Sequence, residues 1–112
     1  MTDKILVLTT CGSEEEAGRI ARALVESRLA ACVTVTPGIR SVYRWQGAIE
    51  ESNEWSLSIK SRFDLFEQLS AELRRLHSYQ TPEILALAVA EGGPEYLQWM
   101  DGELRASEAA EE

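Results

Sequence analysis

The sequence predicts an α+β domain, and three patterns support this prediction. Short apolar or alternating runs, which are typical of strands, recur four times along the chain. Two amphipathic stretches with helical spacing follow the first run and the third run. The resulting order, β-α-β-β-α-β with one more helix at the end, is the split βαβ or ferredoxin-like arrangement. Right-handed crossovers then place both main helices on one face of a four-stranded antiparallel sheet.

The first quarter of the chain predicts a buried strand followed by a helix. Residues 4–9, KILVLT, form a nearly continuous apolar run that suits a central strand. Ser13 opens the helix, and Glu16, three residues later, completes a capping box. Apolar residues then recur at helical spacing, so that one helix face is expected to be buried until the helix ends near Ser27.

The middle of the chain predicts a long β-hairpin. Residues 30–45 have strand character, with an interruption at Pro37-Gly38 that indicates an edge or a bulge. Gln46-Gly47 predicts a tight turn. Residues 48–61 form the third strand, whose second half alternates apolar and polar side chains and so predicts one buried face.

The last part of the chain predicts a helix, a strand and a final helix. The helix covers residues 64–76, and the apolar strand 83–90 is expected to be buried on both faces. Pro94 suits the first turn of the final helix. We therefore predict one domain over residues 1–106 and a disordered acidic tail over residues 107–112.

Composition restricts the classes of function. The chain has 112 residues, of which 45% are hydrophobic, and a net charge of −8. This length predicts one domain, and the negative charge argues against a protein that binds the phosphate backbone of nucleic acid. No apolar run has the length of a membrane span, and the first residues lack the features of a signal peptide. A cytoplasmic protein without a membrane or nucleic-acid partner is expected.

The reactive and charged residues give no sign of an enzyme. Cys11 and Cys32 do not form a C-x-x-C motif, and a cytosolic chain keeps such thiols reduced. The sequence has no phosphate loop, dinucleotide fingerprint or oriented nucleophile–histidine–acid set. Two acidic clusters are predicted to be solvated: Glu14, Glu15 and Glu16, and Glu50, Glu51 and Glu54.

The length of the hairpin predicts an oligomer. Its two strands, 30–45 and 48–61, are far longer than the usual five or so residues. A projecting apolar ribbon is an unprotected edge, and pairing with another copy of the chain covers it. The alternative is a hairpin that bends back onto its own chain. A cyclic trimer closes all edges, but strand length alone does not distinguish it from a dimer.

Nearly the whole chain up to Leu104 resembles the CutA divalent-cation tolerance proteins. The matching segments occur in the family's order: Thr9-Thr10-Cys11, Leu29-Ala30-Ala31-Cys32-Val33, Pro37-Gly38, Ser41-Val42-Tyr43-Arg44-Trp45-Gln46-Gly47, Ile59-Lys60-Ser61, His77-Ser78-Tyr79-Gln80-Thr81-Pro82-Glu83-Ile84 and Tyr96-Leu97-Gln98-Trp99.

The resemblance implies a ferredoxin-like subunit in a tight trimer, similar to that of the PII signalling proteins. It also implies weak binding of copper or other divalent cations, a role in the response to metal ions, and no cofactor required for folding. Some bacterial members have a cysteine at the position of Thr9 and two histidines where this chain has only His77. His77 is therefore the one proposed copper ligand of the family that this chain keeps.

Three residues are candidate metal ligands. His77 has the only imidazole, a common ligand of copper and zinc, and Glu83 can complete its site. The alternative for His77 is a residue that caps the end of its helix. Cys11 lies between a strand and a helix N-terminus, a location that lowers a thiol pKa; the alternative is a small buried residue. Cys32 is predicted to be in the core.

Two further groups of residues are candidates for binding. Lys60, Tyr79 and Glu83 match recurrent polar positions near an inter-subunit cleft of the family, and Lys60 is a candidate ion-pair partner of Glu83. The cleft either binds a small ligand, as in a PII-like module with an anionic effector or partner protein, or holds bonds that fix the trimer. Aromatic and arginine side chains favour protein interfaces, so the predicted trimer interface comprises Tyr43, Arg44, Trp45 and Trp55.

Overall fold

The computed structural model describes residues 1–106, and the predicted acidic tail, 107–112, lies outside the described residues. The elements occur in the predicted order, followed by a last helix: β1 (Lys4–Cys11), α1 (Glu14–Glu26), β2 (Cys32–Trp45), β3 (Ala48–Arg62), the 3-10 turn η1 (Phe63–Leu65), α2 (Phe66–Leu76), β4 (Leu85–Ala88) and α3 (Pro94–Glu103). Within residues 1–106, no helix is long and apolar enough to cross a membrane.

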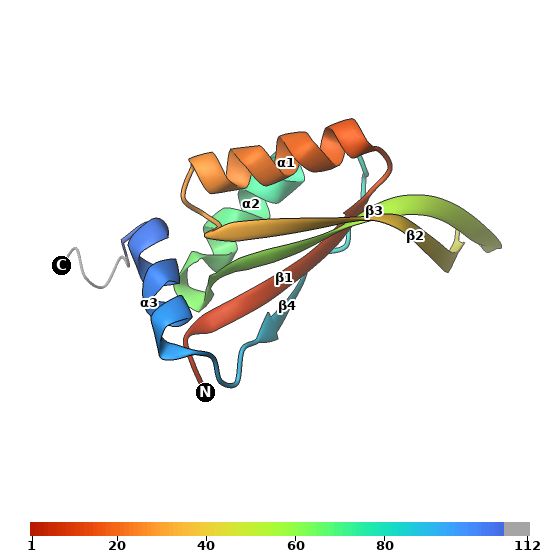
Figure 1. Ribbon diagram of the computed structural model, residues 1–112. Helices are drawn as coiled ribbons and strands as arrows, with labels where there is room; N and C mark the ends of the chain where they lie inside the picture. The colour runs from red at the N-terminus through yellow and green to blue at the C-terminus, as the bar shows by residue number, and fades with distance from the viewer. Residues whose placement is uncertain (107–112) are drawn as a thin grey trace.

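The four strands form one antiparallel sheet in the order β2-β3-β1-β4. Helices α1 and α2 lie together on one of its faces (Figure 1). This arrangement confirms the predicted ferredoxin-like fold. The two edges of the sheet are formed by β2 and β4, because each of them pairs with only one neighbour.

The core lies between the sheet and the two helices. Side chains on alternate positions of β1 and β3 meet the apolar stripes of α1 and α2. The fully buried members of this cluster include Val7, Ile20, Leu57, Ile59 and Leu69. The opposite face of the sheet has neither of these helices, and it presents Leu6 of β1 and, through the register, Leu87 of β4.

The hairpin extends beyond the rest of the sheet. Strand β1 pairs with β3 only as far as Trp55, so the segment 39–54 has no third strand beside it. We call this segment the ribbon; Figure 1 shows that it projects past the helices at one end of the sheet. Gln46 and Gly47 have φ angles of 50° and 84°, which confirms the tight turn, since primed hairpin turns need two positive φ angles.

The interruption predicted at Pro37-Gly38 is a bulge within one continuous strand. The register of β2 and β3 shifts between Thr36 and Ile39, and Gly38 has a φ of 73°. A residue without Cβ takes this conformation without strain. Because the bulge absorbs the one extra residue of β2, this strand continues to Trp45 while the ribbon bends.

Two predicted elements differ from the structure. Strand β4 is shorter than 83–90, and its four residues are exposed rather than buried on both faces. It is an edge strand, and no other segment within residues 1–106 covers its apolar side chains. The second helix was predicted to begin at residue 64, but the turn η1 precedes α2, which begins at Phe66.

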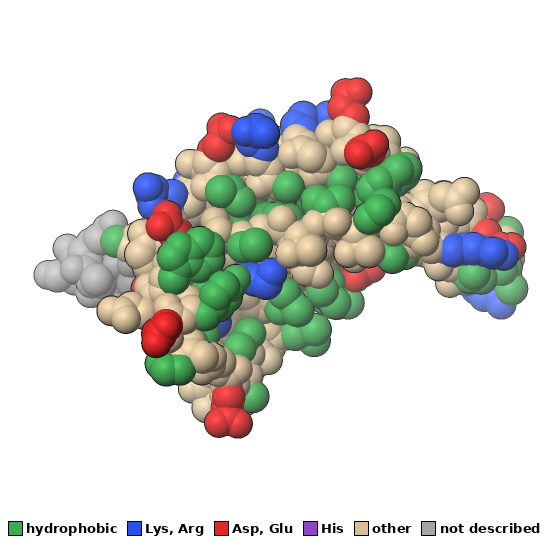
Figure 2. Space-filling model, in the orientation of Figure 1, with side chains coloured by type: hydrophobic (Ala, Val, Ile, Leu, Met, Phe, Trp, Pro, Cys, Tyr) green, Lys and Arg blue, Asp and Glu red, His purple; other side chains and the backbone are tan. Residues whose placement is uncertain are grey.

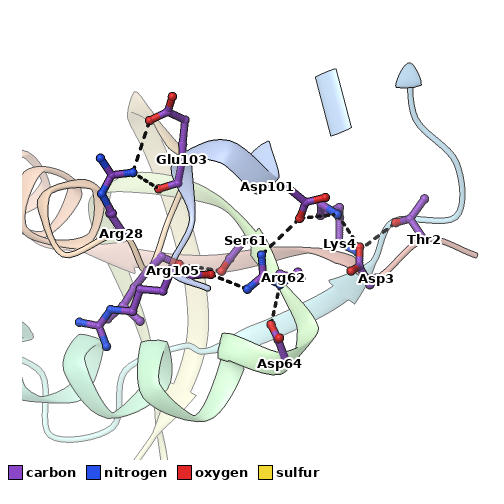
Figure 3. A network of polar contacts seen from close by, with 11 residues as sticks. Thr2, Asp3, Lys4, Arg28, Ser61, Arg62, Asp64, Asp101, Glu103 and Arg105 are labelled. Atoms are coloured by element: carbon purple, nitrogen blue, oxygen red, sulfur yellow. Dashed lines mark hydrogen bonds and ion pairs between the residues drawn. The ribbon is translucent and has the colours of Figure 1, made fainter. Parts of the chain in front are cut away.

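Helix α3 is held at the end of the sheet by charged contacts. Arg62 of β3 has a side chain that is 7% exposed and donates to Asp64 at 2.7 Å and to Asp101 of α3 at 3.2 Å. Lys4, opposite Arg62 in the register, contacts the same oxygen of Asp101 at 3.2 Å. Figure 3 shows Asp101 between the two cations. Arg62 also donates to the carbonyl of Arg105 at 2.6 Å, which fixes the chain beyond α3.

Candidate functional site

A cleft lies where the ribbon meets the loop between α2 and β4. Its volume is about 630 Å³, and ten residues line it: Thr10, Ser41, Val42, Tyr43, Trp45, Glu54, Tyr79, Gln80, Thr81 and Glu83. Four of the residues predicted from the sequence therefore share one cavity, namely Tyr43, Trp45, Tyr79 and Glu83. The lining contains two carboxylates and no lysine, arginine or histidine.

Tyr79 is fixed from three sides. Its hydroxyl donates to Glu54 Oε2 at 2.7 Å, its ring lies against the His77 ring at 4.7 Å between centroids, and its backbone N–H donates to His77 Nδ1 at 3.0 Å. Gly12 permits this position, because a Cβ there would lie 3.2 Å from the Tyr79 hydroxyl. Burial and the bond to Glu54 raise the pKa of Tyr79 well above its ordinary 10.0.

Glu54 is a buried acid at the base of the ribbon. The prediction that the cluster of Glu50, Glu51 and Glu54 is solvated is therefore wrong for Glu54. Glu54 is 6% exposed and lies opposite Ile39, immediately after the bulge. The bulge changes which residues of β2 and β3 face each other. The local charge pattern therefore does not predict that Glu54 is buried. Glu54 is thus a site residue that sequence reasoning did not identify.

Glu16 also has a different role from the one predicted. Ser13 does cap α1, since its side chain accepts from the N–H of Glu16 at 3.1 Å. The carboxylate of Glu16, which is 7% exposed, instead accepts from the backbone N–H of Ser78 at 2.7 Å and from its hydroxyl at 2.9 Å. The capping box is therefore only half formed, and Glu16 holds the loop that positions Tyr79.

His77 uses both ring nitrogens inside the chain. Nδ1 accepts the N–H of Tyr79 and so has no proton, while Nε2 lies 2.7 Å from the carbonyl of Thr10 and so donates one. His77 is 8% exposed. A metal ion at either nitrogen has to displace one of these bonds, so the geometry favours the alternative in which His77 fixes the loop at the end of α2.

Cys11 does not have the environment of an available thiolate. It is fully buried, and its Sγ lies 3.6 Å from the carbonyl of Ser13. Burial raises the pKa of the Cys11 thiol, which is opposite to the lowering expected at a helix N-terminus. Thr9, at the position where some family members have a cysteine, is also fully buried in the helix-facing side of the sheet.

Lys60 and Glu83 do not form the predicted ion pair within one chain. Lys60 donates to Thr34 Oγ1 at 3.1 Å and approaches Cys32 Sγ at 3.7 Å, on the sheet face away from the helices. It does not line the cleft. Glu83 is exposed in the cleft wall, and its carboxylate makes no hydrogen bond or ion pair within residues 1–106.

The predicted interface residues fall into two groups. Tyr43 and Trp45 are 43% and 42% exposed on the ribbon, and the Tyr43 hydroxyl lies 2.7 Å from Ser52 Oγ. Arg44 is exposed between them. Trp55 differs, because it packs against the core of its own chain.

No preformed metal centre exists within residues 1–106. Among residues 1–106, no group of three or more His, Cys, Asp or Glu side chains is placed to hold a metal ion. His77 is close to an acid, since Glu16 lies 3.6 Å from its Nδ1, but both groups already have hydrogen-bond partners. Of the three predicted ligands, only Glu83 is accessible and has no side-chain partner within the part of the chain that the structure describes.

The Tyr79–Glu54 bond predicts a loss of stability at high pH. The folded chain raises the pKa of Tyr79, so it holds the phenolic proton more tightly than the unfolded chain does. The contribution of this proton to the free energy of unfolding is fully present below pH 10.0 and decreases as the pH rises above that value. We expect denaturant unfolding to show this decrease, and Tyr79→Phe to make it shallower.

The control for this pH series is Tyr96→Phe. Tyr96 is 46% exposed on α3, at the other end of the molecule. Its removal is expected to leave the dependence of stability on pH unchanged. An equal alkaline loss in the wild type and in Tyr79→Phe contradicts the assignment.

Comparison with known proteins identifies the family. The family model of the CutA1 divalent ion tolerance protein matches residues 5–103, which is most of the chain. The chain belongs to the CutA1 divalent ion tolerance protein family. The CutA1 name describes tolerance of divalent ions and denotes no catalysed reaction.

Individual relatives agree with this assignment. The divalent-cation tolerance protein CutA of Thermus thermophilus is 50% identical over 95 residues, covering 85% of this chain and 92% of that protein. CutA of Pectobacterium atrosepticum is 41% identical over 94% of this chain and 96% of its own length. The mouse protein CutA is 46% identical over 81% of this chain. The chain spans about half of that protein's length, 51%.

Solved CutA structures have the same fold. The T. thermophilus protein superposes with a TM-score of 0.89 at 47% identity, over 91% of this chain and 99% of that one. CutA of Xylella fastidiosa superposes with a TM-score of 0.90 at 43% identity, over 93% of this chain and 100% of that one. The four-stranded sheet with its helices and ribbon is therefore the CutA fold.

Proposed function

We propose that the protein is a homotrimer that binds copper or other divalent cations weakly and takes part in the response to metal ions. Its family supports the link to divalent ions. The geometry supports weak binding, because one described chain offers single carboxylates rather than a set of ligands. A divalent ion held by few protein ligands keeps much of its hydration. We further propose a cytoplasmic location.

The exposed edges support the trimer. Edge strand β4 presents Leu85 and Leu87, which are 56% and 50% exposed, and the ribbon presents Val42 and Ile49 at 62% and 66%. Figure 2 shows apolar side chains gathered along the part of the sheet that carries β4. Unprotected edges of this kind favour pairing with another chain. Contact between two different edges, such as β2 and β4, is heterologous, and it forms a ring when the rotation between neighbouring copies closes.

The observation that matters most for metal binding is the accessible carboxylate of Glu83. It lies in the cleft wall without an internal partner, whereas His77 and Cys11 are buried and bonded. Carboxylate oxygen is a ligand for divalent cations generally. We therefore place weak binding at Glu83, with other ligands supplied by water or a second copy.

Calorimetric titration with copper, zinc and manganese chlorides tests this proposal. The wild type is expected to give saturable heats in the millimolar range, Glu83→Gln to lose most of the heat, and Glu95→Gln, an exposed acid on α3, to keep it. His77→Gln is expected to retain the heat. Loss of the heat in His77→Gln alone assigns the histidine as ligand instead, and no heat with any of the three ions contradicts the proposal.

The alternative of an anionic effector is not favoured by the cleft of a single chain. Its lining has two carboxylates and no basic side chain, so a negatively charged ligand is repelled.

A further inference from the structure

The ribbon has few contacts that fix its direction. Beyond Trp55 no third strand pairs with it, and a two-stranded hairpin has little stability of its own. Two side-chain contacts stay inside the ribbon, namely Arg40 with Glu51 at 3.1 Å and Tyr43 with Ser52 at 2.7 Å. These contacts hold its two strands to each other, but they do not determine the direction in which the ribbon leaves the sheet.

One side-chain hydrogen bond joins the ribbon to the loop between α2 and β4. The hydroxyl of Tyr79 donates to Glu54 Oε2 at 2.7 Å. Within residues 1–106, no other side-chain hydrogen bond or ion pair connects the segment 39–54 to an element outside β2 and β3. Glu54 is 6% exposed and lies opposite Ile39, immediately after the bulge. The bond to Tyr79 therefore holds the ribbon at the point where it bends.

Tyr79 is itself fixed to elements of the core. Its ring lies against that of His77, whose Nε2 lies 2.7 Å from the carbonyl of Thr10 at the end of β1. The preceding residue, Ser78, donates twice to the carboxylate of Glu16 on α1. The partner of Glu54 is thus connected to β1 and α1. Because this partner is already ordered, the bond restricts the ribbon without the cost of ordering the loop.

We propose that the hydrogen bond between Tyr79 and Glu54 is a latch that fixes the direction of the ribbon before other copies of the chain bind it. An aligned ribbon loses less freedom when the contact forms, and a ribbon that points elsewhere has to return before it can bind. Tyr79 and Glu54 are positioning residues for assembly, and neither has to touch another copy. The effect on assembly rests on the trimer proposed above, whereas the effect on the ribbon of one chain does not.

The rate of assembly during refolding tests the latch in the trimer. After dilution from denaturant, the concentration-dependent rise of the mass, followed by light scattering, reports association of the chains. Tyr79→Phe removes one oxygen atom and is expected to slow this association about tenfold, because loss of a hydrogen bond to a charged group lowers the population of aligned ribbons by about that factor. Its circular dichroism spectrum is expected to match that of the wild type, since Tyr79 is outside the core cluster.

Matched variants separate the latch from a general loss of stability. Ile59→Val removes one methylene from the core and lowers the stability modestly, but it keeps the latch, so the wild-type association rate is expected. Glu54→Gln keeps an oxygen acceptor for the Tyr79 hydroxyl and is expected to retain most of the rate, whereas Glu54→Ala is expected to slow association as Tyr79→Phe does. An unchanged rate in Tyr79→Phe, or equal slowing by Ile59→Val, overturns the proposal.

The order of the ribbon backbone provides a test that needs no trimer. If the wild type scatters light as a single chain, the proposed trimer is wrong, and the latch is tested by NMR order parameters of the ribbon N–H groups. Tyr79→Phe is then expected to lower these values to below about 0.6, while those of α1 stay near 0.85, roughly the value of a rigid backbone. Ribbon order parameters that are the same in both proteins show that the latch is wrong.

Discussion

Replacing Leu87 with glutamate is expected to dissociate the protein into folded single chains. Leu87 is 50% exposed on edge strand β4 and lies on the sheet face away from α1 and α2, beside Leu6 in the register. A trimer that covers this face buries the new carboxylate without a partner. The cost of burying an unpaired charge is several kcal/mol for each copy, which exceeds what one apolar side chain contributes to the contact.

The mass of the variant in solution measures this effect. Leu87→Glu is expected to scatter light as a particle of 12.5 kDa, with a circular dichroism spectrum close to that of the wild type because the core does not include Leu87. Val25→Glu, on α1, is the control: Val25 is 42% exposed and outside β4 and the ribbon, so its variant keeps the mass of the wild type. An unchanged mass for Leu87→Glu contradicts the proposed contact.

Replacing Arg62 with alanine is expected to lower the free energy of unfolding by about 1.5–3 kcal/mol, the usual contribution of hydrogen bonds to charged groups, because its partners Asp64 and Asp101 are 34% and 52% exposed and stay partly hydrated. The Arg62 side chain is 7% exposed and joins η1, α3 and the backbone at Arg105. Without the Arg62 side chain, Lys4 is the one cation of β1 and β3 that remains beside Asp101. The substitution is also expected to leave a void under α3.

The matched control is Arg22→Ala on the outer face of α1. Arg22 and its partner Glu26 are 79% and 68% exposed, so this ion pair is expected to contribute at most about 0.5 kcal/mol. Denaturant unfolding of the wild type and both variants at one protein concentration gives the comparison, since the stability of an oligomer depends on concentration. Similar losses in the two variants contradict the role assigned to Arg62.

The sequence predicts the fold well because the elements differ in their periodicity. Residues 4–9 and the alternation after Trp55 identify the central strands, and Gln46-Gly47 identifies the turn. The error at β4 has a physical cause: apolar composition indicates that a strand is covered, but not whether its own chain or another copy covers it. A single sequence does not distinguish these two cases.

The site was predicted only in part. Tyr79 and Glu83 were identified from their loop, and Tyr43 and Trp45 from the ribbon, but nothing in the sequence joins the two segments into one cleft. Glu16 and Glu54 were interpreted as solvated acids because each lies among other glutamates. Their burial comes from contacts with residues 78 and 79, and such distant pairings cannot be derived from local charge patterns.

The trimer proposed above requires that other copies of the chain complete the exposed ribbon and the edge strand β4. Light scattering of the unmodified protein, measured during dilution into the micromolar range, tests it most directly. For the trimer we expect a constant mass of three times 12.5 kDa. A stable particle with the mass of one chain at these concentrations contradicts it.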